Sequence, residues 1–255
     1  MIKVVLSGCN GAMGRVLNTI IDEMEDMMVV AGIDKNKDLY KNDYPVYESS
    51  LLVKEKCDVI IDFSNPAMLY ELLEFCTNTK TGIVIATTGF NEEQEMKIKE
   101  TSKKTPIFMS SNTSLGINLI LELVKKSVNI LNGEFDIEII EKHHNKKLDA
   151  PSGTACMIAQ AINEELNNSM KYKYGREDRV TKRDKSEIGI HSIRGGSIVG
   201  EHTVIFAGMD EIIEIKHTAL SKSVFARGAI RAAQFISDKA PDLYTMKSLI
   251  ECSTK

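Results

Sequence analysis

The sequence predicts an α/β protein with two domains: an N-terminal, Rossmann-like domain built on a parallel sheet, and a smaller α+β domain with a mixed, largely antiparallel sheet. Three observations predict this. Apolar runs alternate with helix-spaced patterns in the first half of the chain, which is typical of a parallel sheet covered on both faces. A glycine-rich loop directly follows the first apolar run. In the second half, strand-like runs follow one another across short glycine turns.

The first half alternates between strands and helices up to a crossover near Ser114. Continuous apolar runs indicate buried strands, and apolar residues spaced by three and four indicate helices. Pro66 marks a helix start, because proline fits the first helical turn. The strands are expected at Ile2–Ser7, Val29–Ile33, Cys57–Asp62, Ile83–Thr87 and Pro106–Ser110, and the helices at Ala12–Met28, 66–75 and Glu92–Ser102.

The second half contains fewer helices between its strands. Glycine pairs and Gly-x-Asp turns separate three consecutive strand-like runs. The segment Asn167–Lys185 is polar with few aliphatic residues, and we expect it to be an exposed loop. The helices are expected at Leu115–Leu131, Thr154–Leu166 and Lys222–Asp238, and the strands at Phe135–Glu141, Glu187–Arg194, Ile198–Ala207 and Glu211–His217.

Composition excludes several classes of protein. With 255 residues and a net charge of -4, the chain has length for a sizeable core but no general basic field for nucleic acid. No apolar run approaches the ~20 residues that cross a bilayer, and the opening run is too short for a signal peptide. Five widely spaced cysteines without C-x-x-C argue against disulfides or a zinc site and for reduced, mostly buried thiols. We therefore expect a cytoplasmic protein without a metal.

The first glycine loop has the character of a dinucleotide-binding turn. Gly8 can make the tight turn after the strand, Gly11 lets the backbone approach a pyrophosphate, and Gly14 permits close packing of helix on strand. The spacing G-x-x-G-x-x-G is not the common one, and a plain turn would also explain it. Asp34 strengthens the interpretation, because an acid about 20 residues further on can accept hydrogen bonds from ribose hydroxyls.

The residues after Asp34 leave the cofactor open. Lys35 or Lys37 could pair with the 2′-phosphate of NADPH, whereas Asp34 would repel it. Two lysines on a solvated loop are an equally good reading. We expect NADH, NADPH or both to be used.

The segment Glu141–Ala155 is the densest polar stretch of the chain. His143 and His144 can do acid–base work near neutral pH, and Lys147 can pair with an anion or deliver a proton. Ser152 can cap the following helix, whose first N–H groups, at Gly153 and Thr154, would suit a carboxylate. A metal site is disfavoured, because adjacent histidines in a strand point to opposite faces. A solvated basic loop before a capped helix remains the alternative.

Taken together, these motifs resemble the dihydrodipicolinate reductase family over nearly the full chain. The run Glu141–Ala155 is similar to the family signature E-x-H-H-x-x-K-x-D-A-P-S-G-T-A without a gap. Further blocks, in the family's order, are the glycine loop, 62–66, 87–90, 111–118 and 194–203. The resemblance implies reduction of 4-hydroxy-tetrahydrodipicolinate to tetrahydrodipicolinate by hydride transfer from NAD(P)H with loss of water, in diaminopimelate and lysine biosynthesis.

The resemblance also implies roles for particular residues. His143 would be the acid–base residue, although a histidine that orients the substrate carboxylate would look the same in sequence. Lys147 would donate the proton. His144, Gly153 and Thr154 would bind the carboxylates of the dicarboxylate substrate. The residues that would line the cofactor are Gly8, Cys9, Asn10, Gly11, Ala12, Met13, Asp34, Lys35, Ala86, Thr87, Thr88, Ser111, Asn112, Thr113 and Ser114.

The family's architecture implies residues 1–114 and 224–255 as the dinucleotide-binding domain and residues 115–223 as the substrate-binding domain. It also implies a homotetramer assembled through the sheets of the second domain. One departure concerns Ala86, where the family usually has glycine, so approach of the backbone to the nicotinamide is open at this position.

Two rival interpretations are weighed against this resemblance. An amino-acid dehydrogenase, acting on aspartate or homoserine, also combines a glycine loop with an α+β domain, but it would need another substrate signature. A non-catalytic nicotinamide sensor on the same scaffold would have no need of Lys147 or of the carboxylate cradle at Gly153 and Thr154. The site residues, not the fold, favour the reductase.

Overall fold

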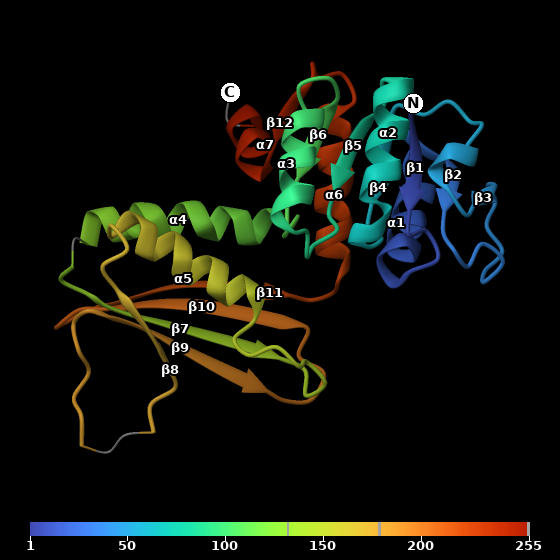
Figure 1. The fold of residues 1–255 in the computed structure, drawn as a ribbon. Coiled ribbons are helices and arrows are strands. Elements are labelled where there is room, and N and C mark those ends of the chain that lie inside the picture. The colour runs from blue at the N-terminus through green and yellow to red at the C-terminus, as the bar shows by residue number, and fades with distance from the viewer. Residues whose placement is uncertain (132, 178–179, 254–255) are drawn as a thin grey trace. The chain divides into compact units, whose positions relative to one another are not determined.

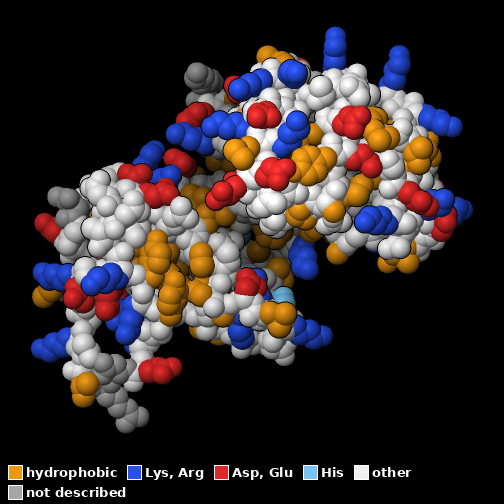
Figure 2. Space-filling model, viewed as in Figure 1, with side chains coloured by type: hydrophobic (Ala, Val, Ile, Leu, Met, Phe, Trp, Pro, Cys, Tyr) orange, Lys and Arg blue, Asp and Glu red, His pale blue; other side chains and the backbone are white. Residues whose placement is uncertain are grey.

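The computed structural model describes residues 1–131, 133–177 and 180–253. The chain divides into two compact units, the first formed by 1–114 with 222–255 and the second by 115–221 (Figure 1). No helix in the described part of the chain is long and apolar enough to cross a membrane. Acidic and basic side chains are intermixed over the face displayed in Figure 2.

The first unit contains a seven-stranded parallel sheet in the order β12-β6-β5-β4-β1-β2-β3. Reversed and without β12, this is the 3-2-1-4-5-6 order of a dinucleotide-binding fold, which confirms the predicted Rossmann-like sheet. Such sheets bind ligands where the strand order reverses, at the carboxyl ends of β1 and β4. The strands are β1 (Ile2–Ser7), β2 (Met27–Ile33), β3 (Val46–Tyr47), β4 (Val59–Asp62), β5 (Gly82–Ile85), β6 (Pro106–Met109) and β12 (Asp242–Tyr244).

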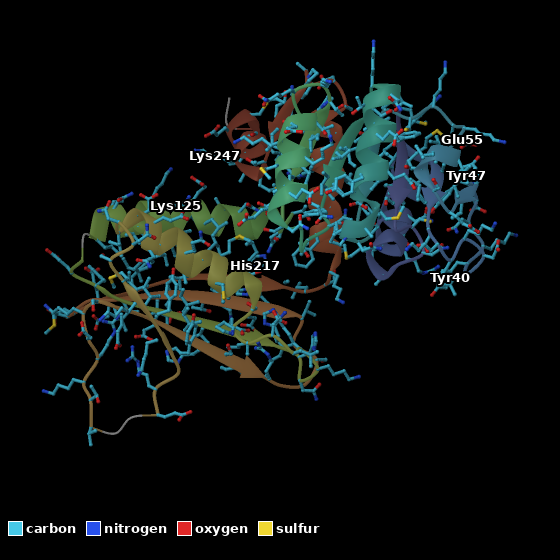
Figure 3. All side chains as sticks on the ribbon, viewed as in Figure 1. Tyr40, Tyr47, Glu55, Lys125, His217 and Lys247 are labelled. Carbon is cyan, nitrogen blue, oxygen red and sulfur yellow. The ribbon has the colours of Figure 1, made fainter. Side chains whose placement is uncertain are left out.

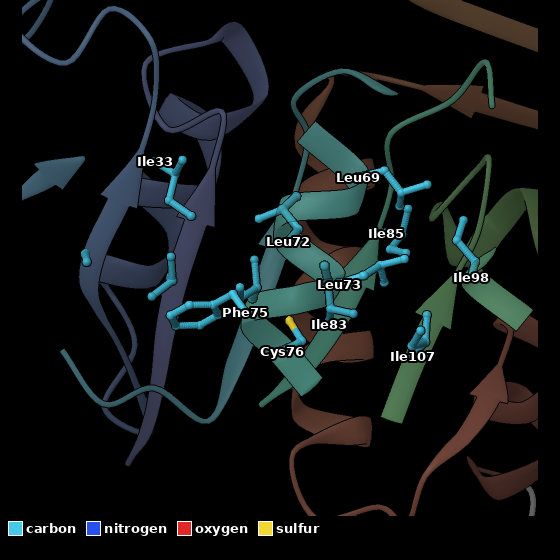
Figure 4. Packing of buried hydrophobic residues seen from close by; sticks show 13 residues of the cluster. Ile33, Leu69, Leu72, Leu73, Phe75, Cys76, Ile83, Ile85, Ile98 and Ile107 are labelled. Atoms are coloured by element: carbon cyan, nitrogen blue, oxygen red, sulfur yellow. The ribbon is translucent and has the colours of Figure 1, made fainter. Parts of the chain in front are cut away.

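Helices cover both faces of this sheet. On one face, α2 (Leu69–Thr79) and α3 (Glu92–Thr101) bury a cluster that includes Ile60, Ile83 and Leu72 (Figure 4). Each such side chain contributes roughly 1.5–3 kcal/mol by leaving water. On the other face pack α1 (Ala12–Asp22) and α6 (Ser223–Ile236). The remaining elements are two short 3-10 helices, η1 (Ser50–Leu52) and η2 (Pro66–Met68), and the helix α7 (Met246–Ser253).

A side-chain hydrogen bond joins β3 to the segment that follows it. The hydroxyl of Tyr47 in β3 donates to Glu55 at 3.1 Å (Figure 3).

The prediction of mostly buried cysteines is wrong: all five thiols are free, but only Cys9 and Cys76 are buried.

The predicted helix Ala12–Met28 is wrong at its end. The helix stops at Asp22, and Met27 and Met28 belong to β2, where they pair in parallel with Ile2 and Lys3. The methionines fitted the helical spacing, yet Met27 is 2% exposed as a strand residue, because pairing with the first strand outweighs the local pattern.

The second unit contains a five-stranded mixed sheet in the order β11-β10-β7-β9-β8. The β10–β11 and β10–β7 pairs are antiparallel, but β7–β9 and β8–β9 are parallel, so the sheet is less antiparallel than predicted. The error arose because β9 and β10, joined by a short turn, are not neighbours; β7 lies between them. The strands are β7 (Asp136–His143), β8 (Lys171–Tyr174), β9 (Glu187–Arg194), β10 (Gly200–Ala207) and β11 (Ile212–Ala219).

Two helices, α4 (Leu115–Leu131) and α5 (Gly153–Glu165), share a buried cluster with this sheet. The cluster takes alternate residues of β7, such as Ile137 and Ile139, so every second side chain of that strand faces the helices. The predicted loop 167–185 is partly wrong, because β8 lies within it; its residues 178–179 lie outside the described part of the chain.

Candidate active site

The candidate site of the first unit is the glycine loop at the end of β1. Gly8 has a φ of +79°, and a Cβ there would lie 2.6 Å from the carbonyl oxygen of Phe63. A Cβ on Gly14 would lie 2.2 Å from the carbonyl oxygen of Gly8. Within the described residues, no side chain caps the N-terminus of α1, which begins after Gly11. The loop thus has the close packing and the uncapped N–H groups that a pyrophosphate needs.

Asp34 lies beside this loop, as its position in the sequence predicts. Its two carboxylate oxygens accept the backbone N–H groups of Asn10 at 3.0 Å and Asn36 at 2.9 Å. A cavity of about 270 Å³ opens here, lined by Gly8, Gly11, Asp34 and Lys35 among others. Lys37 is engaged elsewhere, since its amine pairs with a glutamate, Glu48, at 3.1 Å.

The remaining predicted cofactor residues lie in different environments. Met13, Ala86 and Ser111 to Thr113 line a second cavity of about 220 Å³, together with Phe63 and Phe225. Thr88 is exposed and Ala12 begins α1. The side chains of others are occupied within the protein: Cys9 is 1% exposed, Asn10 donates to the carbonyl oxygen of Asn36, Thr87 accepts the N–H of Ser64, and Asn112 accepts that of Ser114.

Together these features fit a dinucleotide. The glycine cradle leaves no room for a Cβ at two positions, α1 presents its N-terminus, and an acid stands at the ribose position. Sequence reasoning missed Phe63 and Phe225. Phe63 follows β4 directly and lines both cavities, but Phe225 comes from 112 residues after Thr113, whose hydroxyl donates to its carbonyl oxygen at 2.7 Å.

The second unit has a candidate site of its own, where β7 ends. Glu141 and His143 are two residues apart in this strand and therefore share the face that packs against α5. Glu141 is fully buried, and its carboxylate lies 2.6 Å from Nδ1 of His143. It also accepts two hydrogen bonds from Arg194, at 2.7 and 2.8 Å, and one from the backbone N–H of Ser152 at 3.1 Å.

Those donors decide the charge of Glu141. Burial alone would raise the pKa of this carboxyl group. Hydrogen bonds from Arg194, His143 and Ser192 outweigh that effect and lower the pKa to about 2. A buried, ionised carboxylate therefore stands directly behind the first histidine of the signature.

Lys147 and the start of α5 form the open side of the cluster. The Lys147 amine lies 2.8 Å from the carboxylate of Asp149. The pKa of Asp149 is lowered, chiefly by the hydrogen bond from Lys147. An internal carboxylate thus contacts Lys147, a group that the sequence predicted to pair with an anion. Ser152 caps α5 as predicted, accepting the N–H of Ala155 at 3.2 Å.

His144 directly follows β7. Its Nδ1 is buried and has no hydrogen-bond partner within the described part of the chain. Such an atom is costly unless a ligand or water satisfies it. In the described residues, no group of three His, Cys, Asp or Glu side chains could hold a metal.

Sequence reasoning gave no role to Arg194 or His202, although both belong to blocks that resemble the family. Arg194 stands opposite His143 on β9, and His202 stands opposite Glu141 on β10. The rings of His202 and His143 meet edge to face with centroids 5.3 Å apart. A single sequence shows neither pairing, because both depend on the order of strands in the sheet.

A Rossmann-order sheet with a dinucleotide cradle, joined in one chain to a unit that carries an acid–base cluster, defines a pyridine-nucleotide-dependent oxidoreductase. Two family models match the sequence: "Dihydrodipicolinate reductase, N-terminus" over residues 2–113 and "Dihydrodipicolinate reductase, C-terminus" over residues 116–250. The chain belongs to the dihydrodipicolinate reductase family, which confirms the predicted resemblance and the predicted class of enzyme.

Relatives of known name agree. The 4-hydroxy-tetrahydrodipicolinate reductase of Caldanaerobacter subterraneus subsp. tengcongensis is 50% identical, with 98% of this chain and 99% of that one covered. The enzyme of the same name from Clostridium tetani is 48% identical, with 98% and 97% covered. These coverages mean that both units of the chain match together.

Solved structures show the same fold. A dipicolinate-bound dihydrodipicolinate reductase from Paenisporosarcina sp. TG-14 has a TM-score of 0.80 at 27% identity, covering 96% of this chain and 97% of that one. An aspartate dehydrogenase from Thermotoga maritima has a TM-score of 0.52 at 11% identity, covering 94% and 98%. The second likeness extends only to the fold, so it does not favour the rival amino-acid dehydrogenase.

Proposed function

We propose that this chain reduces 4-hydroxy-tetrahydrodipicolinate to tetrahydrodipicolinate, with loss of water, using NADH or NADPH, in the biosynthesis of diaminopimelate and lysine. Family membership over both units supports the reaction. The observation that carries the proposal is the 2.8 Å contact of the Lys147 amine with a carboxylate, that of Asp149. A dicarboxylate substrate offers the same chemical group.

Lys147 is the proton donor in this proposal. An ammonium group beside a dianionic substrate both attracts it and holds a proton close to the ring. His144 and the N–H groups of Gly153 and Thr154 bind the substrate carboxylates, because the N-terminus of α5 carries a partial positive charge. His143 acts as an acid–base residue or orients a carboxylate.

The first unit holds the nicotinamide cofactor, which supplies the hydride when bound. Its residues do the positioning: the glycine loop and the N-terminus of α1 bind the pyrophosphate, and Asp34 accepts from the ribose. Lys35 lines the same cavity as Asp34 and is the candidate for a 2′-phosphate. Lys37 is less suited, because its amine already pairs with a carboxylate. We propose that both cofactors are accepted.

The protein is proposed to work in the cytoplasm as a homotetramer. Exposed apolar side chains on the strands of the second sheet support an interface there, among them Ile193, Ile212 and Ile213, which are 46%, 66% and 37% exposed. Covering such side chains stabilises association by roughly 25 cal/mol per Å² of apolar surface. Sedimentation of the purified protein measures the state directly.

The test follows oxidation of NADH and NADPH with freshly generated 4-hydroxy-tetrahydrodipicolinate. Lys147→Ala is expected to lower turnover by about 10²- to 10⁴-fold, the usual contribution of a positioned proton donor, and to leave cofactor binding unchanged. Lys146→Ala is the matched control, since it removes an exposed neighbouring amine. Cofactor binding by the wild type without oxidation of either cofactor would contradict the proposed function and favour a sensor.

A further inference from the structure

Glu141 is the best-satisfied buried charge of the second unit. One carboxylate oxygen, Oε1, accepts from Nη2 of Arg194 at 2.7 Å and from the backbone N–H of Ser152 at 3.1 Å. The other, Oε2, accepts from Nη1 of Arg194 at 2.8 Å and lies 2.6 Å from Nδ1 of His143. The guanidinium group thus grips both oxygens, and the carboxylate cannot rotate without breaking several bonds.

This arrangement specifies a proton position on His143. An ionised carboxylate only accepts hydrogen bonds, so Nδ1 of His143 must carry the hydrogen of the 2.6 Å contact. In the neutral ring, the other nitrogen, Nε2, is then unprotonated. The bond to one ring nitrogen sets what the other can do.

Gly200 leaves space for that second nitrogen. A Cβ built on Gly200 would lie 3.2 Å from Nε2 of His143, a spacing tighter than ordinary van der Waals contact. Gly200 is buried at the start of β10, and its φ imposes no need for glycine. A methyl group at this position would press on the imidazole, so glycine leaves room for the ring.

A purely structural role would explain less of this geometry. Hydrogen bonds from Arg194 and Ser152 to Glu141 are enough to link β7 to β9 and to the start of α5. The hydrogen bond to His143 does not strengthen this link, since His143 already belongs to β7. It does restrict the ring, whose side chain is 12% exposed and so partly open to a ligand.

We propose that Glu141 is a positioning residue for the reaction: clamped by Arg194, it holds His143 as the Nδ1–H tautomer and leaves Nε2 as the ring nitrogen that meets the substrate. The identity of that substrate rests on the proposed function, but the tautomer does not. A ring that is already held in the required tautomer contributes most to catalysis, because it does not have to reorganise during turnover.

The test is the tautomer of His143 in the full-length protein without substrate, from the ¹⁵N shifts of labelled histidine under conditions where the ring is neutral. The His143→Gln variant assigns the signals among the five histidines. The wild type is expected to show Nδ1 protonated and Nε2 unprotonated. In Glu141→Gln, whose amide can donate as well as accept, the two tautomers are expected to mix.

Glu138→Gln is the matched control. Glu138 is in the same strand but on the other face, where it contacts Arg176 at 2.6 Å, Arg183 at 3.0 Å and Nε2 of His191 at 2.7 Å. This change removes a charge from an equivalent glutamate–arginine–histidine cluster. It is expected to alter the signals of His191 and to leave those of His143 in place.

Activity gives a second readout. Glu141→Gln is expected to lower kcat by up to about 10⁴-fold, as when a carboxylate that holds a catalytic imidazole in one tautomer is changed to its amide, with the affinity for the pyridine nucleotide unchanged. Nε2–H in the wild type, or an unchanged tautomer in Glu141→Gln, would overturn the proposal. The wild-type spectrum decides the matter even if the variant does not fold, and absence of reductase activity would refute the proposed function separately.

Discussion

Replacing His202 by glutamine is expected to flatten the acid side of the stability profile. His202 is 5% exposed, and its Nε2 lies 3.0 Å from the hydroxyl oxygen of Ser152. Burial, reinforced by His143, His217 (Figure 3) and Lys147, lowers its pKa to about 4, while the charge of Glu141 acts in the opposite direction. The folded protein therefore keeps this imidazole neutral near pH 7.

The sign and magnitude follow from linkage. In the unfolded chain the imidazole titrates near 6.5, so on acidification the unfolded state takes up this proton first. The stability contributed by the neutral ring is fully present above about pH 6.5 and is lost as the pH falls toward 4. Between pH 7 and 4.5 this amounts to about 2 kcal/mol, since each pKa unit corresponds to about 1.4 kcal/mol.

The assay compares urea unfolding of wild type and His202→Gln, followed by circular dichroism, from pH 7 to 4.5. Glutamine can keep a polar atom near Ser152 but does not titrate. The lowered pKa of Glu141 acts below pH 4.5, and that of His217 acts in both proteins, so neither affects the difference. Wild type should lose about 2 kcal/mol more than the variant over this range. Parallel profiles, within about 0.5 kcal/mol, would refute the reasoning.

Further substitutions test other parts of the structure. Gly14→Ala should abolish binding of either cofactor in a fluorescence titration, because its methyl group would lie 2.2 Å from a carbonyl oxygen of the loop; retained affinity would contradict the packing. Lys35→Ala should raise the KM for NADPH by up to about fivefold, the usual range for an exposed ion pair, and should change the KM for NADH little; Lys37→Ala should have a smaller effect on the KM for NADPH. Asp149→Asn should lower the KM for substrate severalfold by releasing Lys147, and a raised KM would speak against competition between the two carboxylates.

The parallel sheet of the first unit could be predicted because its determinants are local. Short apolar runs indicate buried parallel strands, and the glycine loop after β1 indicates that a helix follows. The prediction was wrong at the boundary between α1 and β2, where no residue that ends a helix separates the two elements. No glycine or proline separates Asp22 from Met27, so helical spacing ran on into a strand whose partner, β1, is distant in the chain.

The second unit was less predictable because its order of strands is not sequential. The turn at Gly195-Gly196 predicts a hairpin, yet the two strands that it joins lie on either side of β7. Likewise β8 is exposed throughout and has no aliphatic residue, so no buried face marked it as a strand, and its pairing with β9 joins residues distant in the chain.

The signature segment could be predicted as a cluster but not as a mechanism, and the reason lies in Glu141. From the sequence, His143 could be an acid–base residue or could orient a carboxylate. With Nδ1 engaged by Glu141, a neutral His143 offers only an unprotonated Nε2, which accepts hydrogen bonds. A substrate carboxylate has no hydrogen to donate, so His143 could hold one only as an imidazolium. The neutral ring can instead accept a proton, and Lys147 is then the group of the signature with a proton to give.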